Sequence, residues 1–165
     1  MGSDSNKFDP RLHAKRLGRE LAMQFMFQQD LTGDEEFTLH WQRFLNQAVE
    51  EHGLKENRFS RKGIEYAEYL VNGIREHHEE VDSTISEKAD KWDFKRMANV
   101  DRNVMRVAAF EMLFVAEVPP VVSINEAVEI ARDYSGEKAG NFINGVLNGI
   151  KDSLDRPARK AVKEL

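Results

Sequence analysis

The chain has 165 residues, of which 41% are hydrophobic and 32% are charged, and its formal net charge is −5. These values exclude a disordered or fibrous protein and are typical of one soluble globular domain. The absence of cysteine excludes disulfides and thiolate metal sites, and no apolar run is long enough to cross a membrane, so we expect a cytoplasmic protein.

Apolar residues recur three or four positions apart through most of the chain, and no segment alternates between apolar and polar residues. This periodicity is typical of amphipathic helices and not of strands. The expected helices cover residues 10–31, 35–52, 60 to about 85, 101–118, 123–135 and 138–154, with a short turn at 93–97. We therefore expect an all-α, compact single-domain bundle of six to seven helices at 10–154, between a flexible N-terminal leader at 1–9 and a flexible C-terminal tail at 155–165.

Side chains that can cap helix ends mark several of these boundaries. Asp93 can cap the short turn, and Asp101 can cap the helix that follows it. Ser123 and Glu126 have the Ser-x-x-Glu spacing of a capping box, in which each side chain bonds the backbone N–H of the other residue. Gly136 is expected to end that helix, because glycine accepts the left-handed conformation common at such ends.

The stretch NFINGVLNGI at 141–150 contains two Asn-Gly pairs, which are typical of hairpin turns. Its apolar residues nevertheless follow helical spacing, so we expect a helix with Gly145 and Gly149 on one face. Such glycines either allow another helix to pack closely or form a smooth shelf beside a ligand surface. The sequence leaves both interpretations open.

The first expected helix carries a concentration of positive charge. Between residues 10 and 20, Arg11, Lys15, Arg16 and Arg19 are accompanied by one acid, Glu20, which gives a local balance of +3. Because residues four apart share a helix face, Arg11, Lys15 and Arg19 form one stripe. The stripe can bind the phosphates of a nucleic acid, or it can be a solvated face that offsets an acidic body.

The second half of the same helix is apolar nearly all round, with Met23, Met26 and Phe27 on the side of the basic stripe. This side is therefore either buried within the domain or covered by a second protein chain.

Two aromatic residues flank the last expected loop. Tyr134 closes one helix, Phe142 opens the next, and Lys138 lies between them. Aromatic rings stack on unpaired bases, and cations bind the backbone, so this combination is typical of proteins that bind single-stranded RNA. Each residue can also be structural, and Phe142 fits the core stripe of its helix with Val146.

Signatures of catalysis and of metal binding are missing. The sequence contains no Gly-Lys dipeptide, no Gly-x-Ser-x-Gly and no His-Glu-x-x-His. We therefore expect no enzymatic activity, no cofactor and no bound metal.

Three segments carry a resemblance to a known family. They are KRLGRELAMQFMFQQD at 15–30, VDRNVMRVAAFEML at 100–113 and SINEAVEIARDYSGEKAGNFINGVLNGI at 123–150. They resemble the bacterial transcription antitermination factors of the NusB family, and the third segment is the most specific. The likeness covers residues 11 to 153 and is weakest between 31 and 60. Leu17 and Gly18 interrupt the run of basic residues that many relatives have at the start.

The resemblance implies a compact helical domain without catalytic activity. Proteins of this kind bind the boxA segment of nascent ribosomal RNA leaders together with NusE, a ribosomal protein of the small subunit. The complex joins RNA polymerase and other Nus factors and suppresses premature termination. Some relatives also form homodimers through the RNA-binding face, and no membrane is involved.

Roles for single residues follow from the resemblance. It assigns RNA binding to the basic helix, to two aromatic positions and to one loop position, and it assigns Asp101 to the surface that faces NusE. The residues expected to bind RNA are Lys15, Arg16, Arg19, Tyr134, Lys138 and Phe142. For Phe27 we expect contact with a partner protein. The alternative is a helical adaptor that binds only proteins, on which the basic stripe is incidental.

Overall fold

The structure is a computed structural model that describes residues 10–33, 35–51, 57–90 and 92–165, with side chains from His13 onwards. The leader expected at 1–9 lies outside the described residues. The described part consists of α1 (Pro10–Thr32), α2 (Phe37–Glu51), α3 (Arg58–Glu76), α4 (His78–Ala89), η1 (Phe94–Arg96), α5 (Asn99–Phe114), α6 (Pro120–Ser135) and α7 (Glu137–Ser153). Because these residues form seven α-helices and no strand, the all-α prediction is confirmed.

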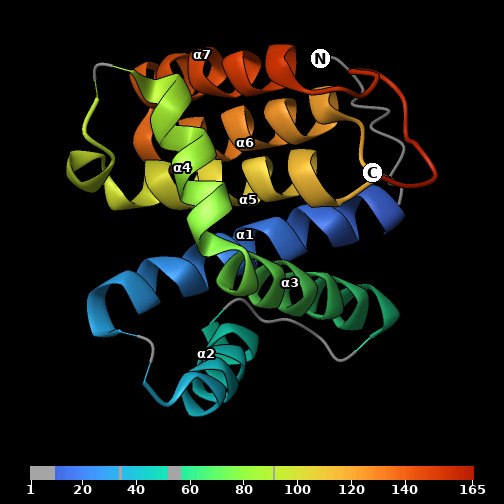
Figure 1. Cartoon of the computed structure of the whole chain (residues 1–165). Helices are drawn as coiled ribbons and strands as arrows, with labels where there is room; N and C mark the ends of the chain where they lie inside the picture. Colours follow the sequence, from blue (N-terminus) through green and yellow to red (C-terminus); the bar gives the residue numbers. More distant parts are fainter. Residues whose placement is uncertain (1–9, 34, 52–56, 91) are drawn as a thin grey trace, which may run out of the picture.

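The helices α5, α6 and α7 lie over one another in a stack, and α4 crosses in front of them (Figure 1). Below this stack, α1 packs against α3, and α2 lies at the far end of the molecule. One core joins these layers and includes the fully buried Phe25, Leu70, Ile85, Met105 and Leu147. None of the described helices is long and apolar enough to span a membrane.

The segment between residues 31 and 60, where the resemblance is weakest, contains α2. Aromatic rings of α2 pack against the end of α1. The ring of Phe25 on α1 lies 4.9 Å from that of Trp41 and 5.4 Å from that of Phe44, between centroids. Edge-on and tilted arrangements of this kind are the favourable ones for aromatic pairs. The same rings bury one face of α2, since Trp41 and Phe44 are both buried.

Two of the expected caps are confirmed and two are wrong. Asp93 accepts a bond from the backbone N–H of Lys95 at the start of η1, and Gly136 ends α6 with φ 91°. Asp101 is not a cap, because α5 already begins at Asn99 after Ala98.

Ser123 and Glu126 form no capping box either, because α6 begins three residues earlier, at Pro120. Proline suits the first position of a helix, where its fixed φ is already helical and its missing N–H is not needed. The freed side chain of Glu126 instead reaches α1.

The Asn-Gly stretch is helical, as expected, but close packing does not explain both of its glycines. A Cβ at Gly149 would touch the side chain of Lys88 at ordinary distances of 3.5–3.7 Å, and a Cβ at Gly145 would meet nothing within 4 Å. Close approach is found elsewhere, where a Cβ on Gly18 of α1 would lie 2.9 Å from the carbonyl oxygen of Gly63 on α3. Gly18, which interrupts the basic run, therefore marks the crossing of two helices.

The segment after α7, for which the polar composition predicts a flexible tail, lies against the turn between α5 and α6. Val162 donates a backbone bond to the carbonyl of Ala116, and the carbonyl of Ala158 accepts one from Val121. Arg156 binds further carbonyls in the same turn. These contacts join distant parts of the chain and have no signature in the local composition.

Candidate nucleic-acid interface

Long side chains join α1 to α6 along a polar seam. Arg16 of α1 reaches Glu126 and Asp133 of α6, and Gln24 of α1 donates a 2.7 Å hydrogen bond to the hydroxyl of Tyr134 at the end of α6. The seam thus brings the basic start of α1 and the aromatic end of α6, which are more than 100 residues apart, to the same surface.

Arg16 lies at one end of this seam and is surrounded by carboxylates. Its guanidinium contacts Glu20 at 2.9 Å, Glu126 at 2.9 Å, Glu129 at 2.8 Å and Asp133 at 3.5 Å. Partial burial opposes its charge, yet the surrounding carboxylates outweigh burial and raise the pKa of Arg16 above its usual value. The side chain keeps 22% of its surface exposed, so a phosphate can reach it, in competition with four acids.

Arg19 is placed differently from the prediction. It is buried, and its Nε donates to both carboxylate oxygens of Glu111 on α5, at 3.0 Å each. The hydroxyl of Tyr66 on α3 donates to the same carboxylate. Burial opposes the charge of Arg19, but Glu111 outweighs it and raises the arginine pKa. Arg19 therefore joins α1 to α3 and α5 and does not present its guanidinium to a ligand, which contradicts the expected RNA contact.

Lys15 lies between α3 and the turn that joins α5 to α6. Its ammonium group is 3.3 Å from the carboxylate of Glu117 and 4.9 Å from the ring centroid of Tyr66. The carboxylate is largely exposed, and exposed ion pairs of this kind contribute little to stability. Lys15 therefore remains available to a phosphate. The side chain of Arg11, which shares the predicted stripe, lies outside the described residues.

Tyr134 and Phe27 line one pocket of about 390 Å³ between α1, α2 and the start of α5. Its other walls include Met23, Phe44 and Val100. Tyr134 is 47% exposed although its hydroxyl is held by a hydrogen bond, and Phe27 is half-buried. A fixed ring with an exposed face is suited to stacking on a flat group.

Asp101 lies beside this pocket, one residue after Val100. Its carboxylate forms a hydrogen bond with the side chain of Ser135, the residue after Tyr134. Burial raises the pKa of Asp101, and the bond from Ser135 only partly opposes this. One of its carboxylate oxygens is buried and has no hydrogen-bond partner in the part of the chain that the structure describes. Because this atom is buried, a donor from outside the chain reaches it only if the side chain turns outward.

Phe142 and Lys138 occupy the first turns of α7. Phe142 is half-buried, and its ring meets that of Trp92 edge-on, 5.4 Å between centroids. Trp92 itself is 62% exposed. Lys138 is exposed and has no ion-pair partner among the described residues. Phe142 packs against the core, as one interpretation expects, and its contact with RNA stays a prediction.

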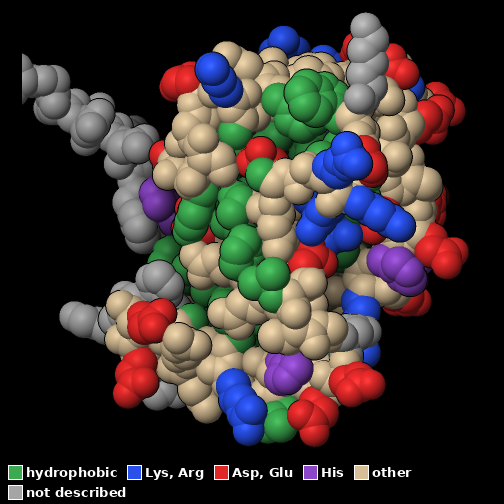
Figure 2. Space-filling view, turned by 90° about the vertical axis from the view of Figure 1, so that its left-hand side faces the viewer, with side chains coloured by type: hydrophobic (Ala, Val, Ile, Leu, Met, Phe, Trp, Pro, Cys, Tyr) green, Lys and Arg blue, Asp and Glu red, His purple; other side chains and the backbone are tan. Residues whose placement is uncertain are grey.

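Figure 2 shows the end of the molecule at which α1 finishes, α5 begins and α6 turns into α7. Hydrophobic side chains are exposed over much of this end, and Lys and Arg side chains gather beside them. Sequence reasoning missed Gln24 and Trp92, for which no local signal exists. It also missed Glu126, Glu129 and Asp133, although their spacing of three and four residues places them on one helix face.

Comparisons with known proteins give one consistent result. A family model described as the NusB family matches residues 16–152. The transcription antitermination protein NusB of Desulfitobacterium hafniense is 36% identical over 147 residues, which cover 89% of this chain and 94% of that protein. The fold is similar to that of T. maritima NusB, with a TM-score of 0.68 and 32% identity over 90% of this chain and 94% of that one. A chain in the crystal structure of antitermination factors NusB and NusE in complex with dsRNA has a TM-score of 0.70 and 29% identity, covering 86% of this chain and 98% of that one.

Proposed function

The chain belongs to the NusB family, and on that premise we propose that it is a transcription antitermination factor that binds boxA-type RNA together with NusE. It is not an enzyme, because the family consists of antitermination factors. The complex with RNA and NusE joins RNA polymerase and other Nus factors, and it acts in the cytoplasm on the nascent transcript.

The observation that supports RNA binding most directly is the seam between α1 and α6. Lys15 and Arg16 lie at one end of it, and the exposed ring of Tyr134 lies at the other. Phosphates fix the position of an RNA strand, and aromatic faces stack on its unpaired bases. We assign phosphate binding to Lys15, Arg16 and Lys138, and base stacking to Tyr134 and Phe142.

The surface around the Tyr134 pocket supports binding of NusE. Phe27 offers a half-buried ring there, and Asp101 offers a carboxylate oxygen that has no partner within the described residues. A partner that covers the pocket would bury apolar area and could donate a hydrogen bond to Asp101 once its carboxylate turns outward. A purely protein-binding adaptor would use the same pocket but would not depend on Arg16.

Replacing Arg16 with glutamine is expected to weaken binding of a boxA-type RNA by about tenfold in the presence of NusE. The loss corresponds to about 1.4 kcal/mol, close to one charge-assisted hydrogen bond. The negative slope of the logarithm of the binding constant against the logarithm of the salt concentration should become shallower by about 0.7, the value for one phosphate contact on a single strand. Filter binding or fluorescence anisotropy over a salt series measures both.

The matched control is Arg43→Gln, which removes the same charge from an exposed position on α2. Melting curves of both variants show whether either change affects the fold. Equal effects of the two substitutions on affinity and slope would argue for a general charge effect and for the adaptor.

Neutralising two of the acids around Arg16 is expected to strengthen RNA binding. Glu129 and Asp133 keep 64% and 69% of their side chains exposed, so Glu129→Gln with Asp133→Asn should leave the fold intact. The change frees Arg16 and removes repulsion of phosphate, and we expect about three- to tenfold tighter binding at low salt. Most of this gain should vanish in an Arg16→Gln background, which a double-mutant cycle measures.

The control for that variant is Glu79→Gln with Glu80→Gln on α4, which changes the net charge equally at exposed positions. The idea would be wrong if the control gained as much RNA affinity, or if the gain persisted without Arg16. Either result would show that the four carboxylates do not compete with phosphate for Arg16.

A further inference from the structure

The C-terminal segment is fixed to the body of the protein by an arginine that caps a helix end. Arg156 donates to the carbonyls of Met112 and Val115 at the end of α5, and to those of Ala116 and Val118 in the turn that follows, at 2.8–3.3 Å. Cations are favourable at helix C-termini, where carbonyl groups lack partners. The backbone bonds at Ala158 and Val162 hold the segment in the same place.

This anchoring leaves three cations of the segment exposed. Arg159, Lys160 and Lys163 lie between or next to the two backbone bonds, and none has an ion-pair partner among the described residues. The two acids of the segment, Asp155 and Glu164, likewise make no ion pair with described residues. The anchored segment thus concentrates three unpaired cations, although the whole chain has a formal net charge of −5. The charge of the chain is therefore unevenly distributed.

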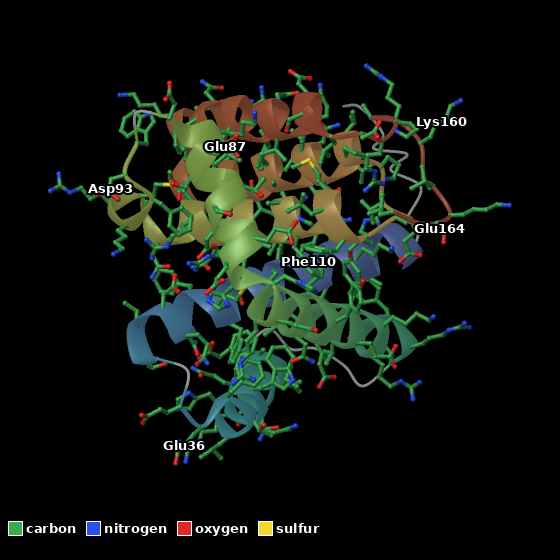
Figure 3. All side chains as sticks on the ribbon, in the orientation of Figure 1. Glu36, Glu87, Asp93, Phe110, Lys160 and Glu164 are labelled. Atoms are coloured by element: carbon green, nitrogen blue, oxygen red, sulfur yellow. The ribbon has the colours of Figure 1, made fainter. Side chains whose placement is uncertain are left out.

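The starts of α1 and α3 lie at the same end of the molecule. Lys15 of α1 contacts Glu117, whose neighbour Ala116 accepts the backbone bond from Val162. The crossing at Gly18 and Gly63 brings the second turn of α3 next to α1. Figure 1 shows the C-terminus beside the first turns of α1, and Figure 3 places Lys160 and Glu164 at this end.

Two more exposed cations, Arg61 and Lys62, directly precede Gly63 and have no ion-pair partner among the described residues. Cations from three parts of the chain therefore share one end of the molecule. We call this surface the basic end. Its members are Lys15, Arg61, Lys62, Arg159, Lys160 and Lys163.

We propose that the basic end binds the phosphate backbone of the RNA that flanks the segment held at the seam between α1 and α6. The inference rests on the proposed function and extends it. Lys15 belongs to the basic end and directly precedes Arg16 on α1, and its partner Glu117 lies in the turn just before α6, which carries the partners of Arg16. A strand bound at the seam can therefore continue towards this surface. Apart from Tyr66 beneath Lys15, the described contacts of the basic end involve no aromatic ring, so binding here is electrostatic and independent of sequence.

The test compares a short boxA-type RNA with the same RNA extended on its 5′ or its 3′ side by about 15 nucleotides, in the presence of NusE. The variant carries Arg159→Gln, Lys160→Gln and Lys163→Gln, and it keeps Arg156 and therefore the anchor. For the wild type we expect one of the extended RNAs to bind about tenfold more tightly than the short one at ~0.1 M salt. The variant should lose most of this gain, because it keeps only Lys15, Arg61 and Lys62 of the basic end, and it should bind the short RNA as before. Its negative salt slope on the extended RNA should become shallower by about 2, since three contacts contribute about 0.7 each.

The control variant carries Arg43→Gln, Lys95→Gln and Arg96→Gln, with the same change of net charge at exposed positions on α2 and η1. Figure 3 shows Asp93, next to η1, at the opposite end of the molecule from Lys160. A wild type that gains nothing from either extension would overturn the inference, as would a gain that persists in the variant or disappears equally in the control. Failure of the wild type and NusE to bind the short RNA would instead contradict the proposed function.

Discussion

Replacing Arg19 with methionine is expected to lower the free energy of unfolding by about 3–5 kcal/mol, the largest effect of any single substitution considered. Glu111 is fully buried and accepts hydrogen bonds from Arg19 and from Tyr66. Methionine fills a similar volume but removes the cation, so the carboxylate is left buried with one neutral donor. Urea unfolding of both proteins under the same conditions measures the difference.

A second variant separates the loss of the ion pair from the loss of packing. Arg19→Met together with Glu111→Leu and Tyr66→Phe replaces the whole buried polar group by apolar side chains, and such replacements are often neutral or stabilising. We expect this triple variant to regain most of the stability that Arg19→Met loses. If Arg19→Met keeps its stability but loses RNA binding, Arg19 is a direct RNA contact, as the sequence predicted.

Arg19 also shows why the site is harder to predict than the fold. The spacing of four correctly predicts that Lys15 and Arg19 share one face of α1. That Arg19 is buried depends on its ion pair with Glu111, which is 92 residues away in the sequence. Helices were predictable because their signals are local: α1 was predicted to within one residue of both of its ends, and Gly136 ends α6 as expected. The single helix expected from residue 60 to about 85 was wrong, because the chain divides at His77 into α3 and α4. Whether a charged side chain is buried depends on which helix packs against its own helix, and no local sequence pattern predicts that packing.

The wrong capping box has a similar physical origin. Ser123 and Glu126 have the correct spacing for a capping box, but Pro120 starts the helix one turn earlier. The side chain of Glu126 then binds Arg16 of α1. Tyr134 and Phe142 were singled out from the aromatic residues beside the last loop, and the resemblance assigned RNA binding to them. The structure adds their partners, Gln24 and Trp92, which sequence reasoning had missed.

Gly18→Ala is expected to lower the free energy of unfolding by about 1–3 kcal/mol, the cost typical of overpacking. The new methyl group would lie 2.9 Å from the carbonyl oxygen of Gly63 and from the Cβ and ring of Tyr66. A backbone oxygen cannot turn aside as a long side chain can, so α1 and α3 must separate. Alanine also favours the helix by about 0.5–1 kcal/mol, which offsets only part of this cost.

The separation would act on function as well, because Gly18 lies between Arg16 and Arg19 and two residues after the seam begins. We expect Gly18→Ala to weaken RNA binding through the displacement of Arg16, even at temperatures where the variant is fully folded. The matched control is Gly145→Ala on α7, where the new Cβ meets nothing within 4 Å and the helix should gain about 0.5–1 kcal/mol. Thermal and urea unfolding of both variants give the comparison. A Gly18→Ala protein as stable as Gly145→Ala would mean that the two helices do not cross as closely as the structure has them.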